Sequence, residues 1–232
     1  MKIKERYCEW FKPFGPYILK TTISDELHKI LLDSAYKVRE NKKLKSKNDY
    51  RKKLAGNLSE EYSYSNIFTK EQEEFVDKEF TWLGSVYTKA SIEALGKDLS
   101  LQPNEVSLLK PIWVNFMKSG EWNPKHTHTG DISCVTYLKV PKEISEENNK
   151  GNTSSKSNTP SAGRIEFLYG EHIDYCNSGR MIEPKEKDIY LFPARLFHSV
   201  YPFKSKTERI SVSCNFANKL KSLKYLEGKG EI

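Results

Sequence analysis

Long apolar runs, paired cysteines and glycine-rich phosphate loops are all absent from this sequence of 232 residues. Without a run of about eighteen apolar residues no transmembrane helix is expected. The mixed-charge N-terminus lacks the apolar stretch of a signal peptide, so we expect a cytoplasmic protein. The four cysteines form no CxxC motif, which predicts reduced thiols and no disulfide framework. Nucleotide-binding folds have no support, because neither GxGxxG nor GxxxxGK[ST] occurs.

Basic residues outnumber acidic ones, 38 to 31, which gives the chain a formal charge of +7. Such a charge is also found in proteins that bind nucleic acids. The lysines are spread widely here, however, and are denser only in residues 41–53 and 219–229. We interpret them as a solvated surface and expect no nucleic-acid partner.

Helical patterns occupy the first half of the sequence, and strand patterns occupy the second. Ser24 is a suitable N-cap for one helix, and Thr69 with Gln72 has the form of a capping box before another, which Gly96 would end. From about residue 106, segments rich in β-branched and aromatic residues predict strands. These segments are 112–117, 132–140, 164–169, 188–192 and 209–216. Helices followed by strands predict an α+β fold.

Residues 142–162 differ from the rest of the strand-rich half, because they are nearly free of apolar side chains. Such a segment buries too little surface to offset the entropy of ordering it, which predicts a disordered loop between two strands. A long loop of this kind is either a functional lid or a tolerated insertion.

Three of the five histidines lie in two short segments of the strand-rich half. His126 and His128 are two residues apart, so an extended strand would direct both to one face. His198 follows Pro193 in an apolar segment, where its imidazole needs a polar partner. Three imidazoles can bind iron(II), zinc or manganese. The alternatives are a solvent-facing strand for the first two and a backbone carbonyl partner for His198.

The last predicted strand has one polar and one apolar face. Arg209, Ser211 and Ser213 alternate with Ile210 and Val212. If the polar face points inward, the buried guanidinium requires an anion, and a dicarboxylate fits because arginine pairs bidentately with carboxylate. The alternative is an outward polar face with the aliphatic residues inside. We favour the inward orientation because the histidines precede it.

Taken in order, these segments resemble the 2-oxoglutarate- and iron(II)-dependent oxygenases, in particular their prolyl hydroxylase and aspartyl/asparaginyl hydroxylase branches. The resemblance extends from about Trp113 to Phe216. The matching pieces are His126-Thr-His128-Thr-Gly-Asp131, Val135-Thr-Tyr137-Leu138, Gly163-Arg-Ile-Glu-Phe167, Tyr190-Leu-Phe-Pro193 with His198, and Arg209-Ile-Ser211-Val-Ser213-Cys-Asn215-Phe216.

The resemblance implies a double-stranded β-helix, or jelly roll, as the catalytic core over residues 106–220. Residues 1–105 would then be a mainly helical N-terminal support region. Residues 142–162 would be a disordered loop inserted in the core, and residues 221–232 a polar tail.

The resemblance also implies a hydroxylase that uses Fe(II), 2-oxoglutarate and dioxygen on an amino acid or peptidyl side chain. His198 is similar to the distal histidine ligand of that family. Arg209 and Ser211 are similar to the residues that clamp the 5-carboxylate of 2-oxoglutarate, and Tyr137 and Asn115 are weaker candidates to line that pocket. Four aromatic residues either line that pocket or belong to the plain core: Trp113, Trp122, Phe116 and Phe197.

The other metal ligands stay open, because most members of this family carry HxD where this chain has His126-Thr-His128. The triad is either His126, His128 and His198, or His128, Asp131 and His198. In the second case Gly130 occupies the carboxylate position, and Asp131 competes for the metal or holds a water on it. We favour the first triad because spacing puts His126 and His128 on one face.

Two other functions compete with this one. Gly120 before the HxH motif and Pro193 before His198 also resemble the two cupin motifs, which would give a three-histidine metalloprotein without 2-oxoglutarate. Arg209 would have no role in it. The other alternative is a non-enzymatic basic β-sandwich that binds polyanions in a salt-sensitive way. The sequence does not identify the prime substrate beyond a small molecule or peptide, and a sheet edge or helix face could form a homodimer.

Overall fold

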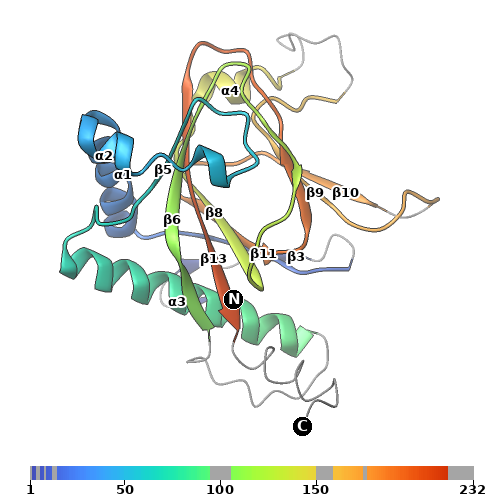
Figure 1. The fold of residues 1–232 in the computed structure, drawn as a ribbon. Helices are drawn as coiled ribbons and strands as arrows, with labels where there is room; N and C mark the ends of the chain where they lie inside the picture. The colour runs from blue at the N-terminus through green and yellow to red at the C-terminus, as the bar shows by residue number, and fades with distance from the viewer. Residues whose placement is uncertain are drawn as a thin grey trace.

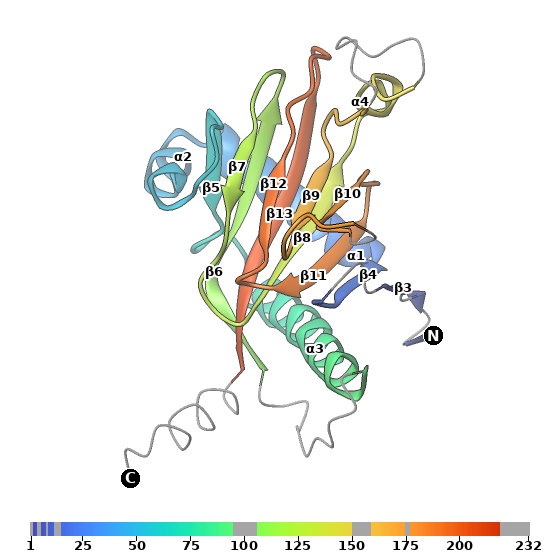
Figure 2. The ribbon, with the colours of Figure 1, turned by 90° about the vertical axis from the view of Figure 1, so that its right-hand side faces the viewer.

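The computed structural model describes residues 2–3, 6–7, 9–11, 15–94, 106–149, 159–174 and 177–218. Two antiparallel sheets of seven and four strands face each other, and helices cover the outer side of the larger sheet (Figure 1, Figure 2). A short pair, β1 (Lys2–Ile3) and β2 (Arg6–Tyr7), lies near the N-terminus. The α+β class and the jelly-roll core with N-terminal helices are therefore confirmed.

The larger sheet has the strand order β3-β4-β11-β8-β13-β6-β5. Its four central strands are β11 (Asp188–Pro193), β8 (Ile132–Lys139), β13 (Glu208–Asn218) and β6 (Val106–Lys118). Its edges are β3 (Glu9–Phe11) and β4 (Ile18–Thr22) on one side and β5 (Glu60–Ser63) on the other. Strands predicted over 112–117, 132–140, 188–192 and 209–216 are thus the central strands of this sheet.

The smaller sheet has the strand order β10-β9-β12-β7. Its strands are β10 (Gly179–Ile182), β9 (Ile165–Leu168), β12 (Phe197–Val200) and β7 (Asn123–His126). Only β9 was predicted from the sequence. All four strands are four residues long, but only β9 (Ile-Glu-Phe-Leu) alternates clearly, whereas β7 (Asn-Pro-Lys-His) and β10 (Gly-Arg-Met-Ile) contain proline or glycine and β12 is interrupted by His198.

The two long helices begin where the sequence predicts. Before α1 (Asp25–Glu40), the Ser24 hydroxyl accepts the Leu27 N–H at 3.3 Å. Before α3 (Lys70–Ala94), the Thr69 and Gln72 side chains each accept the other's backbone N–H, at 3.3 and 3.0 Å. These reciprocal bonds form the predicted capping box. The expected end at Gly96 lies outside the described residues.

Both faces of the larger sheet are buried, which explains why β13 could not be oriented from its alternation alone. Ile210 and Val212 pack in the core between this sheet and the helices α1 and α3. Arg209, Ser211 and Ser213 lie on the opposite face and line a pocket between the two sheets. The inward orientation of the polar residues is therefore confirmed.

The N-terminal region contributes strands as well as helices. β4 pairs with β11, and β5 pairs with β6, so residues 18–22 and 60–63 belong to the jelly-roll sheet itself. Between the long helices lie α2 (Lys42–Lys47) and a turn of 3₁₀ helix, Arg51–Lys53. The mainly helical region predicted for residues 1–105 is thus partly integrated into the core.

The prediction of a disordered loop over residues 142–162 is wrong for its described parts. Residues Lys142–Glu146 form helix α4, and Ile144 is buried in the core between the sheets. The Asn148 side chain donates to the Ala162 carbonyl at 2.9 Å and accepts the Ala162 N–H at 2.8 Å. One buried isoleucine and one asparagine therefore hold a segment whose composition predicted disorder. Residues 150–158, like the predicted polar tail at 221–232, lie outside the described part.

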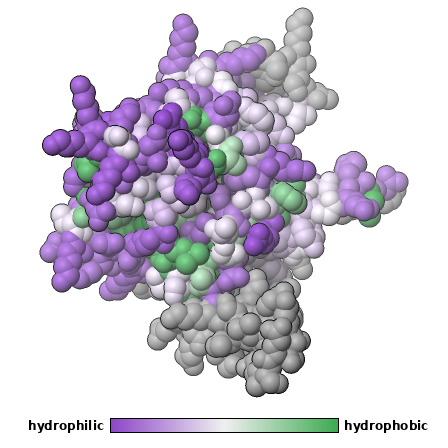
Figure 3. Space-filling model, in the orientation of Figure 1, coloured by the Kyte–Doolittle hydropathy of each residue, from purple (hydrophilic) through white to green (hydrophobic). Residues whose placement is uncertain are grey.

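The surface agrees with the interpretation of the lysines as solvated. The face in Figure 3 is mainly hydrophilic, with apolar residues in small, separate patches. Within the described part of the chain, no helix is long and apolar enough to cross a membrane. Cys134 and Cys214 are free, buried thiols on neighbouring strands, whereas Cys8 and Cys176 fall outside that part.

Candidate active site

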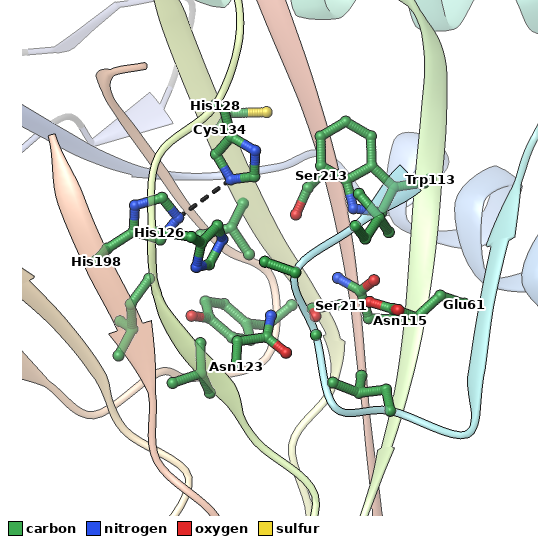
Figure 4. Close-up of a pocket in the computed structure, with 18 of the residues that line it drawn as sticks. Glu61, Trp113, Asn115, Asn123, His126, His128, Cys134, His198, Ser211 and Ser213 are labelled. Carbon is green, nitrogen blue, oxygen red and sulfur yellow. Dashed lines mark hydrogen bonds between the residues drawn. The ribbon is translucent and has the colours of Figure 1, made fainter. Parts of the chain in front are cut away.

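The three histidines singled out from the sequence meet between the two sheets. His126 ends β7 and lies opposite His198 of β12 in the strand register. His128 follows β7, where its N–H donates to the Ala194 carbonyl at 2.8 Å. One ring nitrogen from each histidine lies within 4.8 Å of the others. The Nε2 atoms of His128 and His198 are 3.1 Å apart (Figure 4).

Backbone carbonyls orient two of these rings. The Nδ1–H of His126 donates to the Pro124 carbonyl at 2.6 Å, and that of His198 donates to the Leu196 carbonyl at 2.9 Å. With the proton held on Nδ1, the Nε2 atom of each neutral ring keeps its lone pair. This is the usual outer-shell arrangement of metal-binding histidines.

The cluster keeps its imidazoles neutral. Burial lowers the pKa of His126 below its ordinary value. Burial and the charge of His126 lower the pKa of His128 to about 4, and the same effects together with His128 lower that of His198 to about 3. Neutral imidazoles with free lone pairs are the form that binds a metal ion.

The donor set fits a divalent transition metal. Two imidazole nitrogens bound at about 2.1 Å and at right angles would lie about 3 Å apart. The 3.1 Å between His128 and His198 matches that spacing without rearrangement. Three ligands on one side leave positions open toward the pocket, as a catalytic site requires. His126, His128 and His198 could therefore hold one metal ion.

Asp131, the alternative ligand, points elsewhere. Its Oδ2 accepts the Asn218 N–H at 2.9 Å, and its backbone N–H donates to the Phe216 carbonyl at 2.8 Å. Among the described residues, the group of possible ligands that includes the histidines does not include Asp131. The structure thus brings together the residues of the first triad and not those of the second.

A buried arginine lies in the same pocket as the histidines. Arg209 is 3% exposed, and its Nη1 donates to the Gly163 carbonyl at 2.7 Å. Its guanidinium carbon is 5.4 Å from the centre of the Tyr137 ring. The Nε of Arg209 and the hydroxyl of Tyr137 have no hydrogen-bond partner. Burial lowers the pKa of Arg209, but a guanidinium stays protonated at neutral pH. A buried positive charge with unused donors is a site for an anion.

Comparisons with known proteins agree with this geometry. Residues 111–215 match the family model described as "Putative 2OG-Fe(II) oxygenase". The match covers 105 of the 232 residues, a little under half of the chain, so this strand-rich part is similar to the 2OG-Fe(II) oxygenase family. The matched range contains all three histidines and Arg209, whereas β5 and the helices α1 to α3 precede it.

Solved structures share the fold of this chain. A Pseudomonas putida prolyl-4-hydroxylase superposes with a TM-score of 0.50 at 14% identity, covering 87% of this chain and 92% of its own. AviO1 from Streptomyces viridochromogenes Tue57 gives a TM-score of 0.51 at 10% identity, covering 87% and 89%. At such identities the likeness concerns the architecture. No curated protein sequence matches the chain.

The pocket between the two sheets has room for water-sized groups in a volume of about 40 Å³ and opens to solvent. A row of polar side chains crosses its floor, one from each of four adjacent strands. In the strand register, Tyr137 lies opposite Ser211, Ser211 opposite Asn115, and Asn115 opposite Glu61. The predicted candidates Ser211, Tyr137 and Asn115 therefore do line the pocket beside Arg209.

Glu61, which sequence reasoning missed, ends this row on β5. It is 1% exposed, and its Oε2 has no hydrogen-bond partner. Burial, reinforced by Glu121 and Asp49 and opposed by Arg51, raises its pKa to about 7. Asn123 and the segment Leu54–Leu58 also line the pocket and were not predicted. The sequence around Glu61 carries no apolar alternation that would have indicated a buried strand.

The four aromatic residues expected in the pocket wall or the core lie in three different environments. Trp113 lines the pocket, as expected. Trp122 and Phe197 are instead 42% and 49% exposed. Phe116 faces the other way, into the core beneath the helices. Phe116 is next to Asn115 and Phe197 is next to His198, both of which line the pocket. Adjacent residues of a strand face opposite sides of the sheet, so Phe116 and Phe197 face away from the pocket.

Proposed function

We propose that this protein binds one Fe(II) ion through His126, His128 and His198 and uses 2-oxoglutarate and dioxygen to hydroxylate an amino acid or peptidyl side chain. The observation that supports it most directly is the joint presence of three neutral imidazoles and a buried guanidinium in one pocket. The architecture shared with a prolyl-4-hydroxylase supports an amino acid side chain as the target.

The protein's contribution is position and electrostatics. Bound Fe(II) would supply the activation of dioxygen, with 2-oxoglutarate as the source of electrons. The carbonyls of Pro124 and Leu196 hold two of the ligand rings in place. Burial of the cluster keeps the imidazoles deprotonated on the nitrogen that faces the metal. Among the described residues no carboxylate joins the three histidines. The three neutral rings would therefore leave the charge of the metal ion to be balanced by the anionic cosubstrate.

Arg209 would pair with the 5-carboxylate of 2-oxoglutarate. Its Nε lacks a partner, and Ser211, two residues along the same strand, lies on the same buried face. Burial raises the pKa of Tyr137 to about 12, so its hydroxyl keeps its proton and can donate to the same carboxylate. Asn115, opposite Ser211, is farther along the row and remains the weaker candidate.

The cupin-type alternative explains the three histidines equally well. It leaves Arg209 buried with unused donors and no anion, which is energetically unfavourable. We therefore favour the function that uses 2-oxoglutarate.

The proposal is tested by oxygen-dependent conversion of 2-oxoglutarate to succinate, followed by mass spectrometry. We expect succinate to form only with Fe(II) and dioxygen present, and not in His198→Ala. His172→Ala, which changes an exposed histidine outside the site, is the matched control. A wild-type protein that binds iron but leaves 2-oxoglutarate unchanged, with and without candidate substrates, would favour the cupin-type alternative.

A further inference from the structure

We propose that Glu61, together with Asn115 and Asn123, forms a subsite that binds a cationic nitrogen group of the prime substrate, an ammonium or a guanidinium. This proposal rests on the proposed function, because it takes the pocket between the sheets as the active site. It adds the chemical class of the substrate, which neither the histidines nor Arg209 indicate.

The first observation is a set of three unsatisfied acceptors on the pocket wall. Glu61 Oε2, Asn115 Oδ1 and Asn123 Oδ1 are all buried atoms without a hydrogen-bond partner. Figure 4 shows Glu61, Asn115 and Ser211 on the wall across the pocket from the histidines, with Asn123 between the two groups. A buried acceptor without a donor is costly. An ammonium has three donors and a guanidinium five, so either would satisfy several of these oxygens at once.

The second observation is that no cation among the described residues forms an ion pair with Glu61. Arg51 bonds to Asp49 through Nε and Nη2. Glu60, the neighbour of Glu61 on strand β5, is paired with both Lys45 and Lys118, at 2.6 and 2.8 Å. Glu60 thus has two lysines, whereas Glu61 faces the pocket with none among the described residues.

The third observation is the close packing of a chain segment over this corner. A Cβ placed on Gly56 would lie 2.7 Å from Glu61 Oε1 and 2.8 Å from Asn123 Oδ1. The segment is fixed there, because the Asn57 N–H donates to the Trp122 carbonyl at 2.9 Å. Only a residue without a side chain leaves the two oxygens undisturbed, so Gly56 keeps the acceptors close together beneath the backbone.

The charged side chains of the pocket favour an anionic ligand in one place and a cationic ligand in another. Arg209, which lies beside Tyr137 and two residues from Ser211, suits the anionic cosubstrate, whereas Glu61, at the β5 end of the polar row, suits a cation. The metal-binding cluster lies on the opposite wall, so a group attached to the bound cation can face it. The cationic nitrogen can come from the α-amino group of a free amino acid or from a basic side chain of a peptide.

Binding of small probes to the full chain, loaded with Fe(II) and 2-oxoglutarate under nitrogen, tests the proposal by calorimetry. N-acetyl-lysine methylamide presents a side-chain ammonium alone, leucine methylamide an α-ammonium alone, and N-acetyl-leucine methylamide no charge. We expect at least one cationic probe to bind, and to bind about 10-fold or more weakly to Glu61→Gln, the loss of one charge-assisted hydrogen bond. Glu60→Gln, on the same strand but outside the pocket, should bind like wild type.

The outcomes separate the sources and the hypotheses. Preference for the lysine probe identifies a basic side chain, and preference for leucine methylamide identifies a free amino group. Equal binding of cations to wild type and Glu61→Gln, or no preference over the neutral probe, would overturn the proposal. The iron–cosubstrate absorption band, recorded on the same samples, reports on the proposed function separately. A protein with this band but without cation preference loses only the subsite.

Discussion

The pocket carries buried groups of opposite sign at two ends: Arg209, next to Tyr137 and Ser211, and Glu61, at the β5 end of the polar row. Arg209 lies on a central strand inside the range that matches the oxygenase family, whereas Glu61 lies on edge strand β5, outside it. We interpret the first end as the part that serves the shared cosubstrate, and the second as the part that selects a substrate. An added edge strand can thus change specificity while the strands that hold the metal and the cosubstrate stay the same.

Arg209 and Glu61 also differ in how their charge depends on pH. Arg209 remains a cation in spite of burial, with one carbonyl as its partner. Glu61 has a pKa of about 7, because burial and the charges of Glu121 and Asp49 outweigh the opposing charge of Arg51. The charge at the arginine end is therefore permanent, and the charge at the glutamate end depends on pH and on the ligand.

The largest effect is expected at the metal cluster, on which both ends depend. Replacing His198, which is 4% exposed and central to the cluster, by alanine removes one of three ligands. We expect Fe(II) affinity to fall by at least about 100-fold, more than for loss of an outer-shell partner. Metal titration of this variant beside His172→Ala checks it, and equal affinities would remove His198 from the ligand set.

Removing the charge of Arg209 should weaken the binding of 2-oxoglutarate alone. In Arg209→Ala we expect the Kd for 2-oxoglutarate to rise by about 100-fold, since losing a buried charge pair costs about 3 kcal/mol. Fe(II) affinity should stay near that of wild type. Arg195→Ala, at an exposed arginine, is the control. A variant that binds 2-oxoglutarate normally would show that the two ends do not differ as described.

Removing the charge of Glu61 should stabilise the folded protein above neutral pH. The folded-state pKa of Glu61 is about 7, compared with an ordinary value of 4.5, so its ionisation lowers stability progressively as pH rises from about 4.5 to 7. Each pKa unit corresponds to about 1.4 kcal/mol. Glu61→Gln should therefore raise the free energy of unfolding by up to about 3 kcal/mol at pH 8, and by little at pH 5. Urea unfolding of the ligand-free protein at both pH values measures it. A variant less stable than wild type at pH 8 would indicate an internal ion pair instead.

A smaller effect is expected from Gly56→Ala. The added methyl group would push aside the ends of Glu61 and Asn123, which are flexible enough to move. We expect cation affinity to fall by about 3- to 10-fold, or about 1 kcal/mol, with 2-oxoglutarate affinity unchanged. Gly179→Ala serves as the control, because its nearest neighbours lie at 3.3 and 3.4 Å. If cosubstrate binding weakens equally, the two ends of the pocket are not separable.

The smallest effect is expected at Asp131. Its carboxylate is engaged with the Asn218 N–H, so Asp131→Asn should change Fe(II) affinity by less than about 2-fold. Metal titration tests this directly. A loss as large as that of His198→Ala would instead make Asp131 a ligand and restore the second triad.

The residues around Arg209 could be predicted from the sequence, whereas those around Glu61 could not. The histidines and Arg209 could be predicted because their spacing places chemistry-bearing residues at fixed positions on strands, and helix caps at Ser24 and Thr69 are local signals. The short strand β5 could not, because its sequence is Glu-Glu-Tyr-Ser and its burial depends on pairing with a distant strand. The order around α4 likewise depends on tertiary contacts of Ile144 and Asn148.

The most direct test of the account is the visible absorption spectrum of the anaerobic protein with Fe(II) and excess 2-oxoglutarate. The account predicts a weak metal-to-ligand charge-transfer band in wild type and in Glu61→Gln. It predicts loss of the band in His198→Ala through loss of iron, and in Arg209→Ala at cosubstrate concentrations that saturate wild type. Bound iron without any such band in wild type would contradict the use of 2-oxoglutarate.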